Sequence, residues 1–213
     1  MFNNTQGMQI LQLAVENITH QGLAELSTER VFRPLGMTRT SYVWQPTFED
    51  NYAVGYDEQG HPLPLTKRTK AGAAGSLETT PADYAVFLAA VMQNKGISAT
   101  AQHEMTRAQV RIPYQTQFGP RARVVAADSN RTIQLAYGLG WGTFKSPYGP
   151  AYFKEGHDDG WQNHSVVFAG PKKALLLMSN SSNADKIFKE LLAKLLDDQT
   201  TPWQWEGYIP YDE

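Results

Sequence analysis

Residues 135–178, with the sequence LAYGLGWGTFKSPYGPAYFKEGHDDGWQNHSVVFAGPKKALLLM, decide the fold class. Apolar and aromatic runs in this stretch predict four strands, at 135–144, 152–156, 164–169 and 174–178. A hairpin turn is expected at 170–173, where glycine and proline favour a tight reversal. Strands that follow one another through short connections predict an antiparallel sheet.

Helical patterns precede this sheet. Apolar residues at helical spacing predict a first helix around 10–18, which Gly22 is expected to end. A second helix is predicted over about 24–32 and should stop at Pro34, since proline cannot continue it. A strand at 52–56, a helix at 98–109 and a long loop at 113–132 complete this part.

The clearest helix start lies between these segments, at Thr80. Thr80 is a good N-cap, Pro81 suits the first helical position, and Asp83 is placed like the acid of a capping box. Gly96 is expected to end this helix.

After the strands, Asn183 is expected to cap a closing helix, and an aromatic tail follows. Helices, then antiparallel strands, then a helix predict an α+β fold. We expect two portions within one structural unit. Residues 1–132 form a helical portion with irregular loops, and residues 133–213 hold the sheet, the closing helix and the tail.

The composition excludes several classes of protein. Of 213 residues, 41% are hydrophobic and 19% charged, and the net charge is −2, so no basic patch points to nucleic acid. No run approaches the ~18 apolar residues of a membrane span, and no signal peptide is visible. The absence of cysteine excludes disulfides and thiolate metal sites and leaves the compartment open.

Four motifs then occur in order along the chain. They are PLGM at 34–37, a small-residue loop at 71–80 followed by Asp83, YGLGW at 137–141, and GHDDGW at 156–161. Together they resemble the later part of the serine β-lactamase-like family, which includes class C β-lactamases, D,D-peptidases and esterases. The resemblance spans nearly the whole chain and implies a sheet flanked by helices. It also leads us to expect a fold that is incomplete at its N-terminus.

The resemblance implies acyl transfer or hydrolysis of an amide, ester or lactam through a serine acyl-enzyme, without a cofactor. In that family a lysine one helical turn after the serine helps to remove its proton. None of the lysines here has a serine three residues before it. The family's Tyr-x-Asn motif is missing too, because Phe2 or Asn3 stands at the tyrosine position.

Only a few site residues can therefore be carried over from the family. His157 matches the histidine of the third motif, His-x-Gly, and is the expected catalytic residue. Asp159 stands where that motif has glycine, and Gly160 follows one position later. Asp159, Gly160, Asn4 and Ser76 are the candidates for substrate binding.

Plainer interpretations stand beside these. His157 could be an ordinary sheet histidine. His157, Asp158, Asp159 and His164 could suggest a zinc or manganese site, but Asp-Asp-Gly is also common turn chemistry, and we expect no metal. Ser76 lies outside a Gly-x-Ser-x-Gly motif, so its loop is expected to pack against neighbouring backbone.

Two functional hypotheses follow. In the first, the chain is a segment of a serine hydrolase that is inactive alone and meets a small-molecule or peptide substrate once a Ser-x-x-Lys segment completes it. In the second, it is a non-catalytic, truncated relative that serves as a binding or self-associating module. An incomplete sheet leaves an unpaired edge, so we expect a homo-oligomer or strand exchange.

Overall fold

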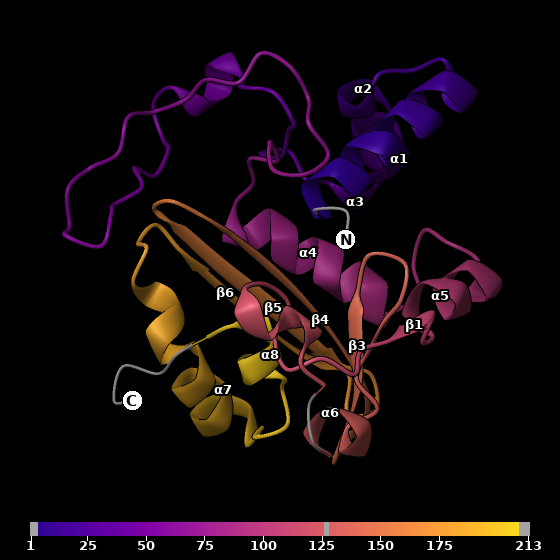
Figure 1. The fold of residues 1–213 in the computed structure, drawn as a ribbon. Helices are drawn as coiled ribbons and strands as arrows, with labels where there is room; N and C mark the ends of the chain where they lie inside the picture. The colour runs from indigo at the N-terminus through magenta and orange to yellow at the C-terminus, as the bar shows by residue number, and fades with distance from the viewer. Residues whose placement is uncertain (1–3, 126–127, 209–213) are drawn as a thin grey trace. The chain divides into compact units, whose positions relative to one another are not determined.

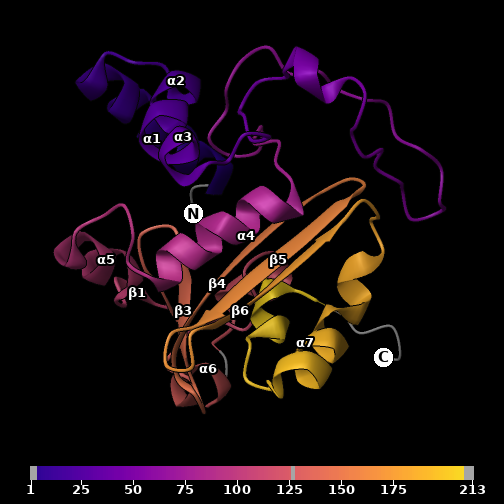
Figure 2. The same ribbon diagram turned by 180° about the vertical axis from the view of Figure 1, so that it is seen from behind.

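The structure, a computed structural model, describes residues 4–125 and 128–208. The chain divides into two compact units. The first unit comprises Met1–Val54 and Pro64–Val91, and the second comprises Gly55–Leu63 and Met92–Glu213. Figures 1 and 2 show their elements from opposite sides.

The regular elements of the first unit are helical. They are α1 (Asn4–Thr19), α2 (Leu23–Ser27), α3 (Arg33–Leu35) and α4 (Pro81–Met92), with a π-helical turn at Thr28–Phe32 and a 3-10 turn at Pro46–Phe48. Gly22 does not end α1, because His20 takes the left-handed conformation with φ 54°. Gly22 instead precedes α2 as its N-cap.

The sequence predicts that the second helical segment stops at Pro34, but the segment continues past this proline. The π-helical turn, in which the backbone N–H of Arg33 donates to Thr28 O, lies just before this proline. Pro34 has no backbone N–H to donate, and here it occupies the first turn of α3, where that donor is not needed. The segment ends at Gly36, whose φ of 74° suits a glycine.

Thr80 caps α4, since its Oγ1 accepts a hydrogen bond from the backbone N–H of Asp83 at 3.2 Å. The expectation that Asp83 acts as a capping-box acid is wrong. Its carboxylate accepts from Arg39 N and from Thr40 Oγ1, each at 2.8 Å, and so holds a loop against α4. Two donors on that loop outcompete the helix's own N-terminus for this acid.

The second unit holds a six-stranded antiparallel sheet in sequential order, which confirms the α+β fold class. The strands are β1 (Val110–Arg111), β2 (Ala136–Tyr137), β3 (Gly142–Ser146), β4 (Gly149–Asp158), β5 (Trp161–Phe168) and β6 (Lys173–Ser179). The expected helix at 98–109 is present as α5 (Ala99–Thr106). The predicted loop at 113–132 contains a 3-10 turn, Pro120–Arg123, and α6 (Ser129–Thr132).

The predicted strand at 135–144 is two strands. A reversal separates β2 from β3, with Gly138 N donating to Trp141 O at 2.8 Å and Gly140 at φ 89°. A Cβ on Gly138 would lie 2.2 Å from Met105 O, so only glycine fits this approach. The YGLGW motif is therefore a hairpin.

The predicted strand at 52–56 is also absent. Only Tyr56 pairs, through isolated bridges to Pro62 and Ser181. After Tyr56, Asp57 Oδ1 accepts hydrogen bonds from the backbone N–H groups of Gln59 and His61, which folds residues 57–61 into a turn.

The core of the second unit lies between the sheet and the C-terminal segments. After β6 come a 3-10 turn, Ala184–Ile187, then α7 (Phe188–Leu196) and α8 (Trp203–Glu206), and α7 and α8 lie on one face of the sheet (Figures 1 and 2). Phe188 and Leu192 of α7 and Trp203 and Trp205 of α8 pack on sheet residues such as Phe153. The described aromatic residues of the C-terminal tail, Trp203, Trp205 and Tyr208, thus belong to the core of the second unit.

Asn183 precedes the closing helices but does not cap them with its side chain. Its Nδ2 donates to Glu58 O at 2.9 Å instead. The side chain therefore fastens the 55–63 segment to the end of the sheet. Among the described residues, no helix has the length and apolar character needed to cross a membrane.

Candidate functional site

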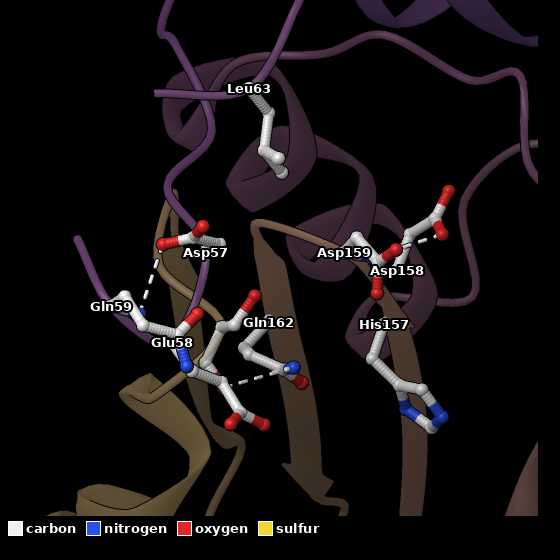
Figure 3. A pocket seen from close by; sticks show the side chains of 9 residues that line it. Asp57, Glu58, Gln59, Leu63, His157, Asp158, Asp159 and Gln162 are labelled. Carbon is white, nitrogen blue, oxygen red and sulfur yellow. Dashed lines mark hydrogen bonds between the residues drawn. The ribbon is translucent and has the colours of Figure 1, made fainter. Parts of the chain in front are cut away.

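A hollow of about 510 Å³ opens in the second unit, beside the turn that joins β4 to β5 (Figure 3). Residues from three separate stretches line it: Asp57, Glu58, Gln59, Leu63, His157, Asp158, Asp159, Gln162 and Ser182. It therefore contains His157 and Asp159, two of the residues expected from the sequence, and Gly160 adjoins them in the turn.

The β4–β5 turn forms one wall. Asp158 pairs with Trp161, so Asp159 and Gly160 are the only residues in the reversal. Gly160 has φ 79°, and its N–H donates to Ser182 Oγ at 2.7 Å. A Cβ on Gly160 would meet Leu63 Cδ1 at 2.6 Å, so this glycine serves both the turn and the close approach of the 55–63 segment.

The 55–63 segment forms the opposite wall and is fixed at several points. Leu63 N donates to Gly55 O at 2.8 Å, which closes the segment on itself. Tyr56 N donates to Asn180 O at 2.9 Å, which ties it to the chain just after β6. The backbone N–H of His61 holds the pKa of the Asp57 carboxyl below its usual range, so Asp57 presents a negative charge at neutral pH.

His157 stands near the end of β4, opposite Gln162 on β5, and is exposed. Its imidazole points away from the carboxylates of Asp158 and Asp159 (Figure 3). Alternation along β4 accounts for the opposite direction of Asp158, and Asp159 belongs to the turn. Asp185 lies within its electrostatic reach. Burial raises the pKa of Asp185, and the charges of Lys186 and His157 act in the opposite direction.

The hollow is acidic. Four of its lining side chains are carboxylates, those of Asp57, Glu58, Asp158 and Asp159, against one imidazole. Such a lining favours hydrogen-bond donors and cations over anions.

Within residues 4–125 and 128–208, no three His, Cys, Asp or Glu side chains are arranged to hold a metal ion. His164, which the metal interpretation of the sequence included, lies buried on β5 beside Glu206.

Ser76 and Asn4 belong to the first unit. Ser76 is buried, and its Oγ accepts from Gly72 N at 2.8 Å and donates to Tyr42 O at 2.9 Å. Both hydrogen bonds are structural, in keeping with a loop that packs against backbone. Asn4 is the first residue of α1, and its side chain lies outside the described atoms, as do Phe2 and Asn3.

Sequence reasoning missed one side of the hollow. Asp57, Glu58 and Leu63 lie about a hundred residues before His157, in a segment that reads as a strand and a turn. Ser182 was missed as well. No periodicity or motif marks these residues, because only the tertiary pairing of Tyr56 with the end of β6 brings them to the site.

Comparisons with known proteins bear on the fold and the family. A family model described as Beta-lactamase matches residues 1–198. The octameric penicillin-binding protein homologue from Pyrococcus abyssi aligns with a TM-score of 0.72 and 21% identity, over 98% of this chain and 45% of that chain. A comparison with curated proteins gave no match.

Two further solved structures are similar. The β-lactamase/D-alanine carboxypeptidase from Pseudomonas syringae has a TM-score of 0.68 and 15% identity, over 92% of this chain and 58% of that chain. The D-amino acid amidase from Ochrobactrum anthropi SV3 has a TM-score of 0.64 and 22% identity, over 92% of this chain and 61% of that chain. The chain thus spans about half the length of the solved structures it matches.

Proposed function

The chain belongs to the β-lactamase family, and from that premise we propose that it is a segment of a serine hydrolase that is inactive on its own. The reaction would be transfer or hydrolysis of an acyl group from an amide, ester or lactam. A small molecule or a peptide would be the substrate, once a nucleophile-bearing segment completes the site.

One observation carries the proposal. In these 213 residues no serine stands three residues before a lysine, so no helix can place a hydroxyl beside an activating amine in the family's manner. The serine that lines the hollow, Ser182, accepts a hydrogen bond from Gly160 N, and within the described part of the chain its hydroxyl bonds to no lysine or histidine. Ser76 is occupied by two structural hydrogen bonds.

His157 is the residue to which we assign a role in the completed site. It is exposed, lines the hollow and corresponds to the histidine of the family's third motif. Its imidazole would stabilise charge on the substrate, with Asp159 and Gly160 contacting substrate from the adjoining turn. Asn4 and Ser76 enter the proposed site by resemblance alone.

Intact-mass spectrometry tests the missing nucleophile. The chain is incubated with a penicillin and, separately, with a serine-reactive phosphonate, alongside an active serine β-lactamase as positive control. We expect the control to gain the mass of the reagent and this chain to stay unmodified. A stoichiometric adduct would overturn the proposal. Peptide mapping and the variants Ser182→Ala and Ser76→Ala would then identify the reactive serine.

A non-catalytic, self-associating module is the second candidate. The octameric assembly of the Pyrococcus abyssi homologue supports self-association in this family. The genomic reading frame that precedes the codon for Met1 distinguishes the two candidates. An in-frame Ser-x-x-Lys favours the hydrolase segment, whereas its absence favours the module.

A further inference from the structure

Arginine is the only charged residue type between Glu104 and Asp128, although the whole chain carries a net charge of −2. Three of these arginines, Arg111, Arg121 and Arg123, are exposed. Within residues 4–125 and 128–208, none of the three takes part in an ion pair. Because a guanidinium group keeps its charge at any ordinary pH, this stretch presents uncompensated positive charge on the second unit.

Two of the arginines belong to a hairpin that is anchored to its unit. An isolated antiparallel bridge between its first and last residues defines the 114–125 hairpin. The 3-10 turn Pro120–Arg123 lies within it and holds both arginines. Gln117 N donates to Trp205 O at 2.7 Å, which fastens the hairpin to α8. The charges are therefore carried by an ordered surface element.

Exposed apolar side chains accompany these charges on the same hairpin. Phe118, Val124 and Val125 are 53%, 46% and 64% exposed. Single apolar residues on a surface are ordinary, but several on one short element form a patch, and patches of this kind mark interaction surfaces.

The two properties together define the chemistry of the partner. Guanidinium groups recognise phosphate oxygens through paired hydrogen bonds. Apolar side chains gain little from a soluble polyanion, whereas they gain free energy when they enter the boundary between the headgroups and the acyl chains of a bilayer. A bilayer that contains anionic phospholipids satisfies both requirements, since basic residues are drawn to its surface.

We propose that the 114–125 hairpin, with Arg111 three residues before it, binds the surface of a bilayer that contains anionic phospholipids. The arginines contact phosphate groups, and Phe118 and its apolar neighbours enter the acyl boundary. The association is peripheral and needs no spanning segment. It goes beyond the proposed function, because it depends neither on hydrolase chemistry nor on self-association.

Co-sedimentation with vesicles tests the charges. The unaltered chain should bind vesicles of equal parts phosphatidylcholine and phosphatidylglycerol, should not bind phosphatidylcholine alone, and should bind less as salt is added. We expect the double variant Arg121→Gln with Arg123→Gln to weaken binding by roughly 5- to 30-fold. Arg30→Gln with Arg33→Gln makes the same change at exposed positions of the first unit and should leave binding unchanged.

The apolar contribution has a test of its own. Phe118→Ser should weaken binding to the mixed vesicles by roughly 3- to 10-fold, because the ring no longer enters the acyl boundary. Ile18→Ser is the matched control, since Ile18 is 79% exposed on α1, outside the hairpin. Circular dichroism checks that each variant folds. Arg111→Gln replaces the arginine double variant if that variant does not fold.

The outcomes separate a bilayer from other partners. Weaker binding in the arginine and Phe118 variants, with both controls unchanged, supports the proposal. A chain that ignores the mixed vesicles at low salt overturns it. Binding that needs the arginines but ignores Phe118→Ser overturns the bilayer and favours a soluble polyanion, for which polyglutamate is the probe. Equal losses in the controls overturn the hairpin as the surface. None of these results bears on the adduct test of the missing nucleophile.

Discussion

Glu206 faces His164 in the interior of the second unit, and both side chains are fully buried. Glu206 Oε2 lies 3.1 Å from His164 Nδ1, at the distance of an ion pair. The ring of Trp203 lies 4.6 Å from the imidazole and helps to exclude water. Burial raises the pKa of Glu206, and the Glu155 carboxylate adds to the rise, while His164 and Lys154 oppose it.

This residue predicts a pH dependence of stability. Since the pKa of Glu206 is raised on folding, its contribution is fully present below the unfolded value near 4.5 and is lost as pH rises through the folded value. The free energy of unfolding should therefore fall less between pH 4.5 and 7.5 in Glu206→Gln than in the unaltered chain. Urea titrations at the two pH values measure this.

The control for that titration is Glu104→Gln. A hydrogen bond from Arg107 lowers the pKa of half-buried Glu104. The stability that Glu104 contributes therefore has the opposite pH dependence from that of Glu206 and is lost as pH falls. If Glu206→Gln and the unaltered chain show the same pH dependence, burial of Glu206 does not govern the stability of the second unit.

At the scale of elements, the β4–β5 hairpin depends on Gly160. Gly160→Ala would force a side chain into φ 79° and within 2.6 Å of Leu63 Cδ1, so we expect a loss of about 1–3 kcal/mol. Gly156→Ala, on strand β4 just before this turn, is the matched control, since its Cβ would meet nothing within 4 Å. Urea denaturation compares the two, and equal losses would show that the turn does not require glycine.

The sequence predicted the elements whose causes are local. Thr80 with Pro81 marks the start of α4, and Gly170 with Pro171 marks the β5–β6 turn, because each acts on its immediate neighbours. The family motif predicted a catalytic role for His157; the structure places His157 in the lining of the hollow, and its role stays a prediction.

The misses have tertiary causes. Asp83 looks like a capping acid, but donors on a loop more than forty residues earlier take its carboxylate. The YGLGW run reads as one strand because its alternation is strong, yet Gly138 must approach the backbone of Met105, and the chain reverses there. No pattern within 55–63 indicates that it forms half of the hollow, since Asn180 and Asn183 hold it there from the end of the sheet.

At the scale of the whole molecule, the two compact units interleave along the sequence. The 55–63 segment interrupts the first unit yet hydrogen-bonds to the end of the sheet in the second. We therefore expect it to lose protection together with the sheet, although its neighbours in sequence belong to the first unit. Compact units of this kind often open as cooperative groups.

Trp205→Ala tests this expectation. Trp205 is buried, with its ring 5.9 Å from Phe153 and 6.4 Å from Tyr137, and its truncation should cost the second unit about 3–5 kcal/mol. Hydrogen exchange read by mass spectrometry should then rise in β3–β6 and in 55–63, and less in α1–α3. Trp44→Ala, which removes ring contacts to Phe48 and Tyr52 in the first unit, should give the converse pattern. A uniform rise across both units in either variant would mean that the chain opens as one cooperative body.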